Sequence, residues 1–401
     1  MPHLDEAFLD SAESLEALDS RGSLRALATA GAQVRRAIVA AREAGIDRVA
    51  GGDRPRSVLV ASLGGSSVVC DVLDVLAEPG SPVPLTTRRE APLPGWIGPL
   101  DLVIAVSLSG RAQGPLALAA EAARRGASLL TVGAADSPLA DICARGRGVH
   151  VDVASPAPTS RAALWSMLTP VLLAADGLGL VDCSEAVLER VADLLDERAE
   201  ECRPSSESFV NPAKILAVGL AETVPVVLGD GALTGVAAGR AAAMLARTAR
   251  MPATHGSLPD AASQVVACFD GPFSGIGANG NGSGGAPDGG RDLFADPFLD
   301  GPPTPQLGLL MLRDHPQVAA QPGSPEHLAG LEAGRLAEAV AESARDAGVR
   351  VWEVEALGGH PIERLASLIA ITDYAATYLA LGLGLDPAVS RHVTDLRDRT
   401  S

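Results

Sequence analysis

The feature that most constrains the fold of this chain is a repeated change of hydrophobic period. Short apolar runs alternate with longer segments that carry an apolar stripe at helical spacing. In the first half of the chain the apolar runs are Ser57–Ser62, Leu102–Val106, Ser128–Val132 and Gly148–Val153, and the helical patterns are Ser66–Leu76, Pro115–Arg125 and Pro138–Ala144. This alternation predicts a parallel sheet whose two faces are both covered by helices, a doubly wound αβα sandwich.

The same alternation begins a second time in the second half of the chain. Two predicted helices, Arg161–Leu178 and Cys183–Glu201, separate the two cycles. The second cycle has predicted strands at Pro225–Gly229, Gln264–Cys268, Gly308–Leu312 and Val349–Val354, and predicted helices at Ala232–Ala249, Glu326–Asp346 and Pro361–Leu381. The chain therefore predicts an α/β protein with two doubly wound parallel-sheet domains in tandem.

The expected domain boundaries follow from this pattern. Residues 1–50 carry helical patterns at Leu15–Ala26 and Ala32–Ala44, which we expect to pack on the first domain. The first domain with its helical extension is expected at 51–204, and the second at 205–401. Residues 271–305 are rich in glycine, proline and asparagine, a composition that cannot bury a core, so we expect a flexible insertion there.

Charge and cysteine usage exclude several classes of protein. The net charge is −17, and no basic cluster is present that could bind nucleic acid. The apolar stretch Leu164–Val181 is interrupted by Pro170 and Asp176, which favours a buried core helix over a membrane span. The five cysteines are scattered, no metal-ligand spacing is present, and the N-terminus lacks a signal-peptide pattern. We therefore expect a cytoplasmic protein with reduced thiols and without a cofactor or metal.

Two turns stand where a buried strand is followed by a helix. They are Gly64-Gly65-Ser66 and Ser107-Leu108-Ser109-Gly110. Small residues, hydroxyls and backbone N–H groups at a helix N-terminus can hold a phosphate. The alternative is purely structural, because the glycines could serve tight packing and the serines could cap a helix. Since the two strands are expected to be neighbours, the pair of turns favours one anionic ligand held from both sides.

The order of further motifs makes the pattern specific. After the two turns come Ser160-Arg161-Ala162-Ala163-Leu164, then Asn211-Pro212-Ala213-Lys214, then Asp373-Tyr374 with Tyr378-Leu379-Ala380, and finally Gly384-Leu385-Asp386-Pro387. In this order the motifs resemble those of the bifunctional phosphoglucose/phosphomannose isomerase family, whose members contain two sugar isomerase (SIS) domains. The resemblance covers most of the chain from about residue 57 onwards, apart from the insertion.

The resemblance implies a fold, a ligand and an assembly. The fold is a tandem of SIS domains, and the ligand is a phosphorylated hexose bound between them. The phosphate is expected at Gly64, Gly65, Ser66, Ser107 and Ser109, and the family's pattern directs Arg161 toward C1–C2 of the sugar. The resemblance also implies a homodimer. The implied reaction is the interconversion of glucose 6-phosphate or mannose 6-phosphate with fructose 6-phosphate.

The sequence departs from the family at the positions that would carry acid/base chemistry. Ala112 replaces a phosphate-binding threonine, and Arg247 or Thr248 stands where the family has a glutamate base. Ser263 replaces the histidine that assists ring opening, and Arg397 replaces the C-terminal lysine. Arginine stabilises negative charge but stays protonated, so it makes a poor base.

Other side chains close to these positions could act as acid or base. His255 and Asp260 flank the turn where the family's base and histidine lie, so they join Arg161 and Arg397 as candidate catalytic residues. Each also has a structural interpretation: His255 as a loop histidine, Asp260 as a turn residue or helix cap, and Arg161 as part of a surface ion pair. Glu222 could be a solvated helix end and His360 a neighbour of a helix N-cap.

Three functions remain open from the sequence. The first is a phosphohexose isomerase, as the resemblance implies. The second is a sugar-phosphate-binding protein without catalysis, a regulator or partner in mannose metabolism, since the family's acid/base residues are replaced. The third is an isomerase of another sugar phosphate whose base has moved. A carboxylate or imidazole that points at the C1–C2 region of the sugar would distinguish the enzymes from the binding protein.

Overall fold

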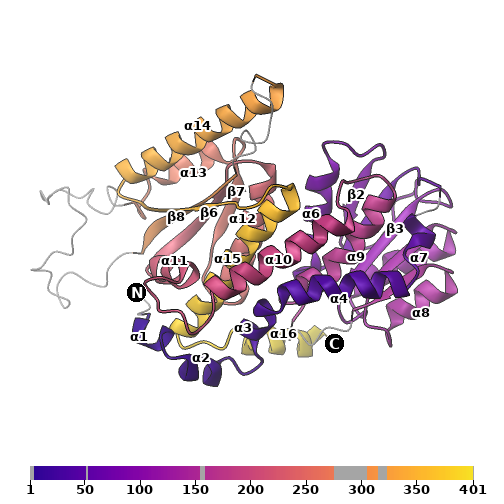
Figure 1. The fold of residues 1–401 in the computed structure, drawn as a ribbon, viewed down its shortest axis with the longest axis horizontal. Coiled ribbons are helices and arrows are strands. Elements are labelled where there is room, and N and C mark those ends of the chain that lie inside the picture. Colours follow the sequence, from indigo (N-terminus) through magenta and orange to yellow (C-terminus); the bar gives the residue numbers. More distant parts are fainter. Residues whose placement is uncertain (1–3, 51–52, 154–158, 275–304, 315–322, 401) are drawn as a thin grey trace, which may run out of the picture. The chain divides into compact units, whose positions relative to one another are not determined.

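The computed structural model describes residues 4–50, 53–153, 159–274, 305–314 and 323–400 (Figure 1). Its chain divides into two compact units. The first unit consists of Arg21–Glu200 with His360–Ala366, and the second consists of Met1–Ser20, Glu201–Gly359 and Ser367–Ser401. Residues 1–20, which we expected on the first domain, thus group with the second unit. Most of the expected insertion at 271–305 lies outside the described residues, namely 275–304.

The first unit is built on a five-stranded parallel sheet with the order β2-β1-β3-β4-β5. Its strands are β1 (Val58–Ser62), β2 (Leu85–Arg88), β3 (Leu102–Ser107), β4 (Ser128–Gly133) and β5 (Val149–Asp152). Every residue of β1 and β3 is buried, as both faces of the sheet are covered. β1 leads to β2 on one side and β3 leads to β4 and β5 on the other, so the strand order reverses between β1 and β3.

Helices cover both faces of this sheet. The helices of this unit are α3 (Ser23–Ala28), α4 (Ala30–Glu43), α5 (Asp47–Ala50), η1 (Gly64–Ser66), α6 (Val68–Ala77), α7 (Gln113–Arg124), α8 (Pro138–Arg145), α9 (Leu164–Gly177) and α10 (Glu185–Glu201). α7 and α8 bury Leu118, Ala122 and Leu139 against Leu59 and Val103 of the sheet. α6 and α9 contact the sheet as well, and α9 is buried along most of its length.

The second unit repeats the topology of the first. Its parallel sheet has the order β7-β6-β8-β9. The strands are β6 (Thr223–Gly229), β7 (Thr254–Ser257), β8 (Gln306–Arg313) and β9 (Arg350–Glu355). The helices are α1 (Glu6–Leu9), α2 (Ala12–Leu18), α11 (Pro212–Ala221), α12 (Ala232–Arg247), α13 (Ala262–Cys268), α14 (Pro325–Asp346), α15 (Pro361–Gly382), whose first residues belong to the first unit, and α16 (Arg391–Thr400). The order corresponds to β2-β1-β3-β4, which confirms the expected tandem of doubly wound sheets.

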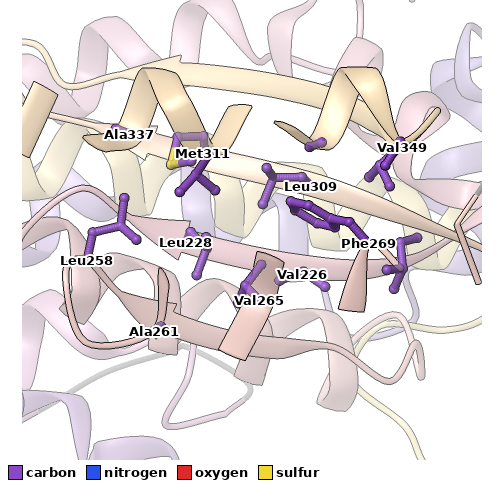
Figure 2. Packing of buried hydrophobic residues seen from close by; sticks show 14 residues of the cluster. Val226, Leu228, Leu258, Ala261, Val265, Phe269, Leu309, Met311, Ala337 and Val349 are labelled. Atoms are coloured by element: carbon purple, nitrogen blue, oxygen red, sulfur yellow. The ribbon is translucent and has the colours of Figure 1, made fainter. Parts of the chain in front are cut away.

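One face of the second sheet carries a continuous apolar core. Figure 2 shows Val226 and Leu228 of β6 and Leu309 and Met311 of β8 packed with Phe269. Residues Ala337, Val340 and Ala344 of α14 complete this core at helical spacing. The core thus fixes α13 and α14 on one face of the sheet.

The structure corrects three expectations about local structure. Gln264–Cys268, predicted as a strand, forms most of helix α13, because the buried residues Ala261, Val265 and Phe269 recur every fourth position. The single helix predicted at Leu15–Ala26 is interrupted before α3 by Gly22, whose φ is +66°. The short edge strands β2 and β7 were not predicted, because their residues are mostly half-buried or exposed and carry no apolar run.

Helix α15 is long and apolar enough to cross a membrane, with a mean hydropathy of 1.4, yet its apolar window is fully buried inside the protein. Among the described residues no other helix is both long and apolar enough to do so. Burial of this kind is typical of the core helix of a globular protein, and the expected core helix within Leu164–Val181 is likewise buried, as α9.

Candidate functional site

The candidate site lies at the carboxyl edge of the first sheet, where the strand order reverses. β1 and β3 pair in parallel, with Ser62 opposite Val106, so both strands end at the same edge. β1 leads into η1 and β3 into the loop at 107–110. In open α/β sheets the crevice outside the carboxyl ends of the strands at such a switch point is the usual ligand-binding position. The two predicted turns therefore flank this position.

The glycine turn packs closely against the segment that carries Arg161. A Cβ atom added to Gly65 would lie 2.5 Å from Ser160 Oγ and 3.3 Å from Arg161 Cγ. Gly64 adopts a φ of +64°, which favours glycine. Only a residue without a side chain fits at 65, so the close approach explains Gly65 and brings Arg161 to the turn. The sequence predicted this meeting only through the family resemblance.

The serines of the turns differ in what their hydroxyls contact. Ser66 is buried, and its hydroxyl donates to Met167 Sδ at 3.4 Å. Ser107 is buried as well and accepts a hydrogen bond from the N–H of Ala112 at 3.4 Å, directly before α7. The exposed Ser109 accepts from Arg111 N–H at 3.3 Å. The Ser107 hydroxyl thus holds the backbone directly before α7, a structural role, and the hydroxyl of Ser109 is the more accessible one.

A serine that the sequence reasoning did not select supports the second turn. Gly110 has a φ of +61°, and a Cβ there would lie 2.1 Å from Ser137 Oγ. Ser137 caps α8, accepting from Ala140 N–H at 3.3 Å and donating to Ala134 O at 2.6 Å. The sequence did carry a signal for this cap, because the serine is followed by Pro138 at the start of a helical pattern, and proline is common at the first position of a helix. Gly110 therefore lets the loop after β3 approach the loop after β4.

The remaining candidate catalytic residues belong to the second unit. His255 is an exposed residue of the edge strand β7, and its imidazole Cε1 lies 3.5 Å from where a Cβ of Gly239 in α12 would be. Asp260 is exposed in the turn between β7 and α13. Arg397 lies in α16, and its side chain is outside the described residues. Arg161 and the two phosphate turns, in contrast, belong to the first unit.

Two weaker candidates have structural contacts. Glu222 ends α11 and forms an ion pair with Arg350 at 3.6 Å, with both side chains partly exposed. His360 precedes α15, and its Nδ1 accepts a hydrogen bond from Ile362 N–H at 3.3 Å. These contacts correspond to the solvated helix end and the capping position that the sequence left open as alternatives.

The equivalent edge of the second sheet is filled by one of the protein's own carboxylates. Asp230 follows β6 and is buried. It accepts hydrogen bonds from Asp314 N–H and from the Thr234 hydroxyl, both at 2.9 Å, and pairs with Arg313 at 3.5 Å. Burial raises the pKa of Asp230 despite these contacts. A backbone N–H, a hydroxyl and a guanidinium thus contact the Asp230 carboxylate at the edge of the second sheet that corresponds to the edge of the first sheet with the two turns.

No metal site or reactive thiol emerges in the described part of the chain. There, no three His, Cys, Asp or Glu side chains are grouped to hold a metal ion. The five cysteines are free, and only Cys268 is exposed. Burial raises the pKa of Cys70 to about 11 and that of Cys183 to about 12, which keeps both as thiols at neutral pH.

Solved structures share the fold of this chain. The whole chain superposes on a hypothetical protein from Thermus thermophilus with a TM-score of 0.66, covering 100% of this chain and 99% of that one at 14% identity. A glucose-6-phosphate isomerase like protein from the same organism gives a TM-score of 0.53 at 21% identity, covering 94% and 96% of the two chains. At these identities the likeness shows the fold alone, the tandem SIS fold of phosphosugar isomerases.

Sequence comparison gives two further matches. Residues 209–400 match the family model described as the bacterial phospho-glucose isomerase C-terminal SIS domain. A bifunctional phosphoglucose/phosphomannose isomerase from Caldicellulosiruptor bescii is 26% identical over 196 residues, which are 49% of this chain and 57% of that relative. The alignment thus spans little more than half the length of the relative. These two matches support a divergent relative of the bifunctional phosphoglucose/phosphomannose isomerases.

Proposed function

We propose that the chain binds a phosphorylated hexose at the carboxyl edge of the first sheet and isomerises it. Two observations support the proposal: Gly65 closely approaches Arg161, and the Gly64–Ser66 turn and the Ser107–Gly110 loop lie at the carboxyl ends of the paired strands β1 and β3. The substrates we propose are glucose 6-phosphate and mannose 6-phosphate, with fructose 6-phosphate as the common product. The family-model match and the name of the curated relative support this choice.

In this proposal the phosphate is held by Gly64, Gly65, Ser66, Ser107 and Ser109. Backbone N–H groups at a helix N-terminus and the exposed Ser109 hydroxyl suit a phosphate oxygen. Ser66 and Ser107 contribute their backbone, because their hydroxyls are committed to Met167 and Ala112. The resemblance directs Arg161 toward C1–C2, where a guanidinium stabilises the oxyanion of an enediolate.

Aldose–ketose isomerisation also needs a base and an acid that opens the ring. His255 and Asp260 are the candidates in this proposal, and both are exposed on the second unit. Arg397 would supply further positive charge. The family resemblance supports a homodimer, and the family's soluble metabolic members support a cytoplasmic location.

A second function is favoured by a specific observation. Thr248, at one of the two positions aligned with the family's glutamate base, is buried, and its hydroxyl lies 3.8 Å from Met244 Sδ. The other position is Arg247, and neither side chain can accept a proton at neutral pH. The alternative is therefore a sugar-phosphate-binding protein without turnover, a regulator or partner in mannose metabolism.

A coupled assay that detects fructose 6-phosphate distinguishes the two functions. The purified full chain is supplied with glucose 6-phosphate or mannose 6-phosphate, alongside the Arg161→Ala variant. Turnover that Arg161→Ala lowers by ~10²-fold or more supports the isomerase, since electrostatic stabilisation of an oxyanion contributes about that much. Absence of turnover, while the same sugars raise the melting temperature, supports the binding protein.

The phosphate site is tested separately by ligand binding. We expect Ser107→Ala combined with Ser109→Ala to weaken fructose 6-phosphate binding by roughly tenfold or more, because the phosphate loses its charge-assisted hydrogen bond to the Ser109 hydroxyl and the loop loses the Ser107 contact with Ala112 that holds it. Ser205→Ala, an exposed serine of the second unit, serves as the control. Unchanged affinity in the folded double variant would exclude the proposed phosphate site.

A further inference from the structure

A cavity of about 580 Å³ opens at the amino edge of the first sheet, opposite the candidate sugar-phosphate site. It is lined by residues just before β1, β3, β4 and β5, by α5 and by Leu178. Strand β1 is five residues long and strand β3 is six. At ~3.3 Å per residue they separate the two edges by ~17–20 Å. The cavity is thus distinct from the phosphate turns.

Arginine side chains gather in this cavity. Arg48, Arg54, Arg56 and Arg147 line it, and Asp53 is the acidic residue among its lining. Such a cluster is unusual in a chain with 49 acidic and 32 basic residues. The cavity therefore has a positive local charge within a protein of net charge −17.

Only one of these arginines is neutralised inside the protein. Arg56 pairs with the buried Asp101 at 2.6 Å. Across the described residues, no carboxylate pairs with Arg48, Arg54 or Arg147. Three guanidinium groups of like charge repel one another unless an anion lies between them. With Asp53 counted, the cavity thus has an uncompensated positive charge of about two units.

The backbone holds Arg147 in an unusual conformation. Its φ is +55°, a region that side chains other than glycine seldom adopt. It lies between Gly146 and Gly148, where a third glycine would fit the turn without strain. Arg147 therefore lines the cavity although its backbone conformation disfavours any residue with a side chain.

We propose that this arginine cavity, lined by Arg48, Arg54, Arg56 and Arg147, binds a small polyanion with two or more phosphate groups, of nucleoside diphosphate size. Guanidinium groups bind phosphate oxygens in bidentate geometry, and three of them can contact more oxygens than a single phosphate presents. The volume falls within the range of small-molecule sites. Pro99 and the 70% exposed Leu100 offer an apolar rim for a ring. Because the cavity and the phosphate turns are on opposite edges of the sheet, such a ligand would bind without competing for the sugar site.

Isothermal titration calorimetry of the full chain tests this inference. The probes are tripolyphosphate, ADP and inorganic phosphate at 50 mM and 200 mM salt. We expect tripolyphosphate and ADP to bind more tightly than phosphate, and their affinity to fall with salt. If ADP binds more tightly than tripolyphosphate, the ligand is a nucleotide whose ring uses the apolar rim. If tripolyphosphate binds more tightly, the cavity recognises the phosphate groups alone. Absence of binding by both polyanions at low salt would overturn the proposal.

Matched variants locate the binding. Arg54→Ala combined with Arg147→Ala should weaken tripolyphosphate binding by ~100-fold, roughly tenfold for each charge-assisted contact. The control, Arg25→Ala with Arg36→Ala, removes two exposed arginines of the same unit outside the cavity and should bind as the parent does. Arg54→Gln combined with Arg147→Gln replaces this variant if it fails to fold. Equal loss in the control, or loss in the Ser107→Ala, Ser109→Ala variant, contradicts the assignment.

Discussion

At the scale of single residues, Asp101 shows how one buried carboxylate fixes an edge of the sheet. It accepts hydrogen bonds from Arg56 Nη2 at 2.6 Å, Ser57 Oγ at 2.7 Å and Gly98 N–H at 2.8 Å. Burial alone would raise the pKa of Asp101, but these hydrogen bonds outweigh it and hold the pKa below its ordinary value. The carboxylate therefore joins the segments that precede β1 and β3.

Asp101→Asn should lower the free energy of unfolding by about 2–3 kcal/mol at pH 7, because the buried network loses its negative charge and one of its two acceptor oxygens. The folded pKa of Asp101 lies below the unfolded value, so its contribution is present above the unfolded pKa, near 4, and is lost as the pH falls through the folded pKa. The difference between parent and variant should thus shrink below pH ~4 in urea titrations. Asp136→Asn, an exposed aspartate, is the control. A difference that stays constant with pH would contradict this account.

The sequence could identify individual site residues only where the local pattern carries the signal. Gly64, Gly65, Ser107 and Ser109 follow buried strands, so their positions at the sheet edge were predictable. The hydrogen bond of the Ser66 hydroxyl to Met167 was not predictable, because the two residues are distant in the sequence. Asp230 was missed for the same reason, since its N–H and guanidinium partners come from the end of β8.

At the scale of elements, close packing rather than composition explains the glycine turn. Gly65→Ala would press a methyl group on Ser160 and on the stem of Arg161, at 2.5 Å and 3.3 Å. We expect fructose 6-phosphate binding to weaken by ~10- to 100-fold, because the turn and Arg161 must shift apart, while the melting temperature changes little. Gly95→Ala, where nothing lies within 4 Å of the added Cβ, should leave binding unchanged. Equal affinity for both variants would separate Gly65 from the ligand site.

Long elements with a clear hydrophobic period were predictable, and short ones at the sheet edges were not. α12 and α14 carry buried residues at helical spacing and were predicted within a few residues of their ends. α13 was predicted as a strand, because five residues of apolar character fit either period until the buried Ala261 and Phe269 are known. The polar edge strands β2 and β7 are defined by pairing with β1 and β6, a long-range interaction that local sequence does not reveal.

At the scale of the whole molecule, the two sheets share one strand order but differ at their switch points. The first leaves two glycine- and serine-bearing turns at its carboxyl edge, while the second has the buried Asp230 among the groups that could hold an anion. A second carboxylate or phosphate would meet like charge there. The duplicated fold therefore predicts a single sugar-phosphate site in each chain.

Calorimetric titration with fructose 6-phosphate should accordingly give one ligand per chain. The measurement is made on the Arg54→Ala, Arg147→Ala variant, so that the arginine cavity does not add to the count. Adding Ser107→Ala and Ser109→Ala to that variant should weaken this single site, whereas Asp230→Asn should leave the affinity of the first-sheet site unchanged, because Asp230 belongs to the other sheet. Two sites of comparable affinity in the Arg54→Ala, Arg147→Ala variant would mean that the second sheet binds ligand despite Asp230, and the assignment of the site to the first sheet alone would fail.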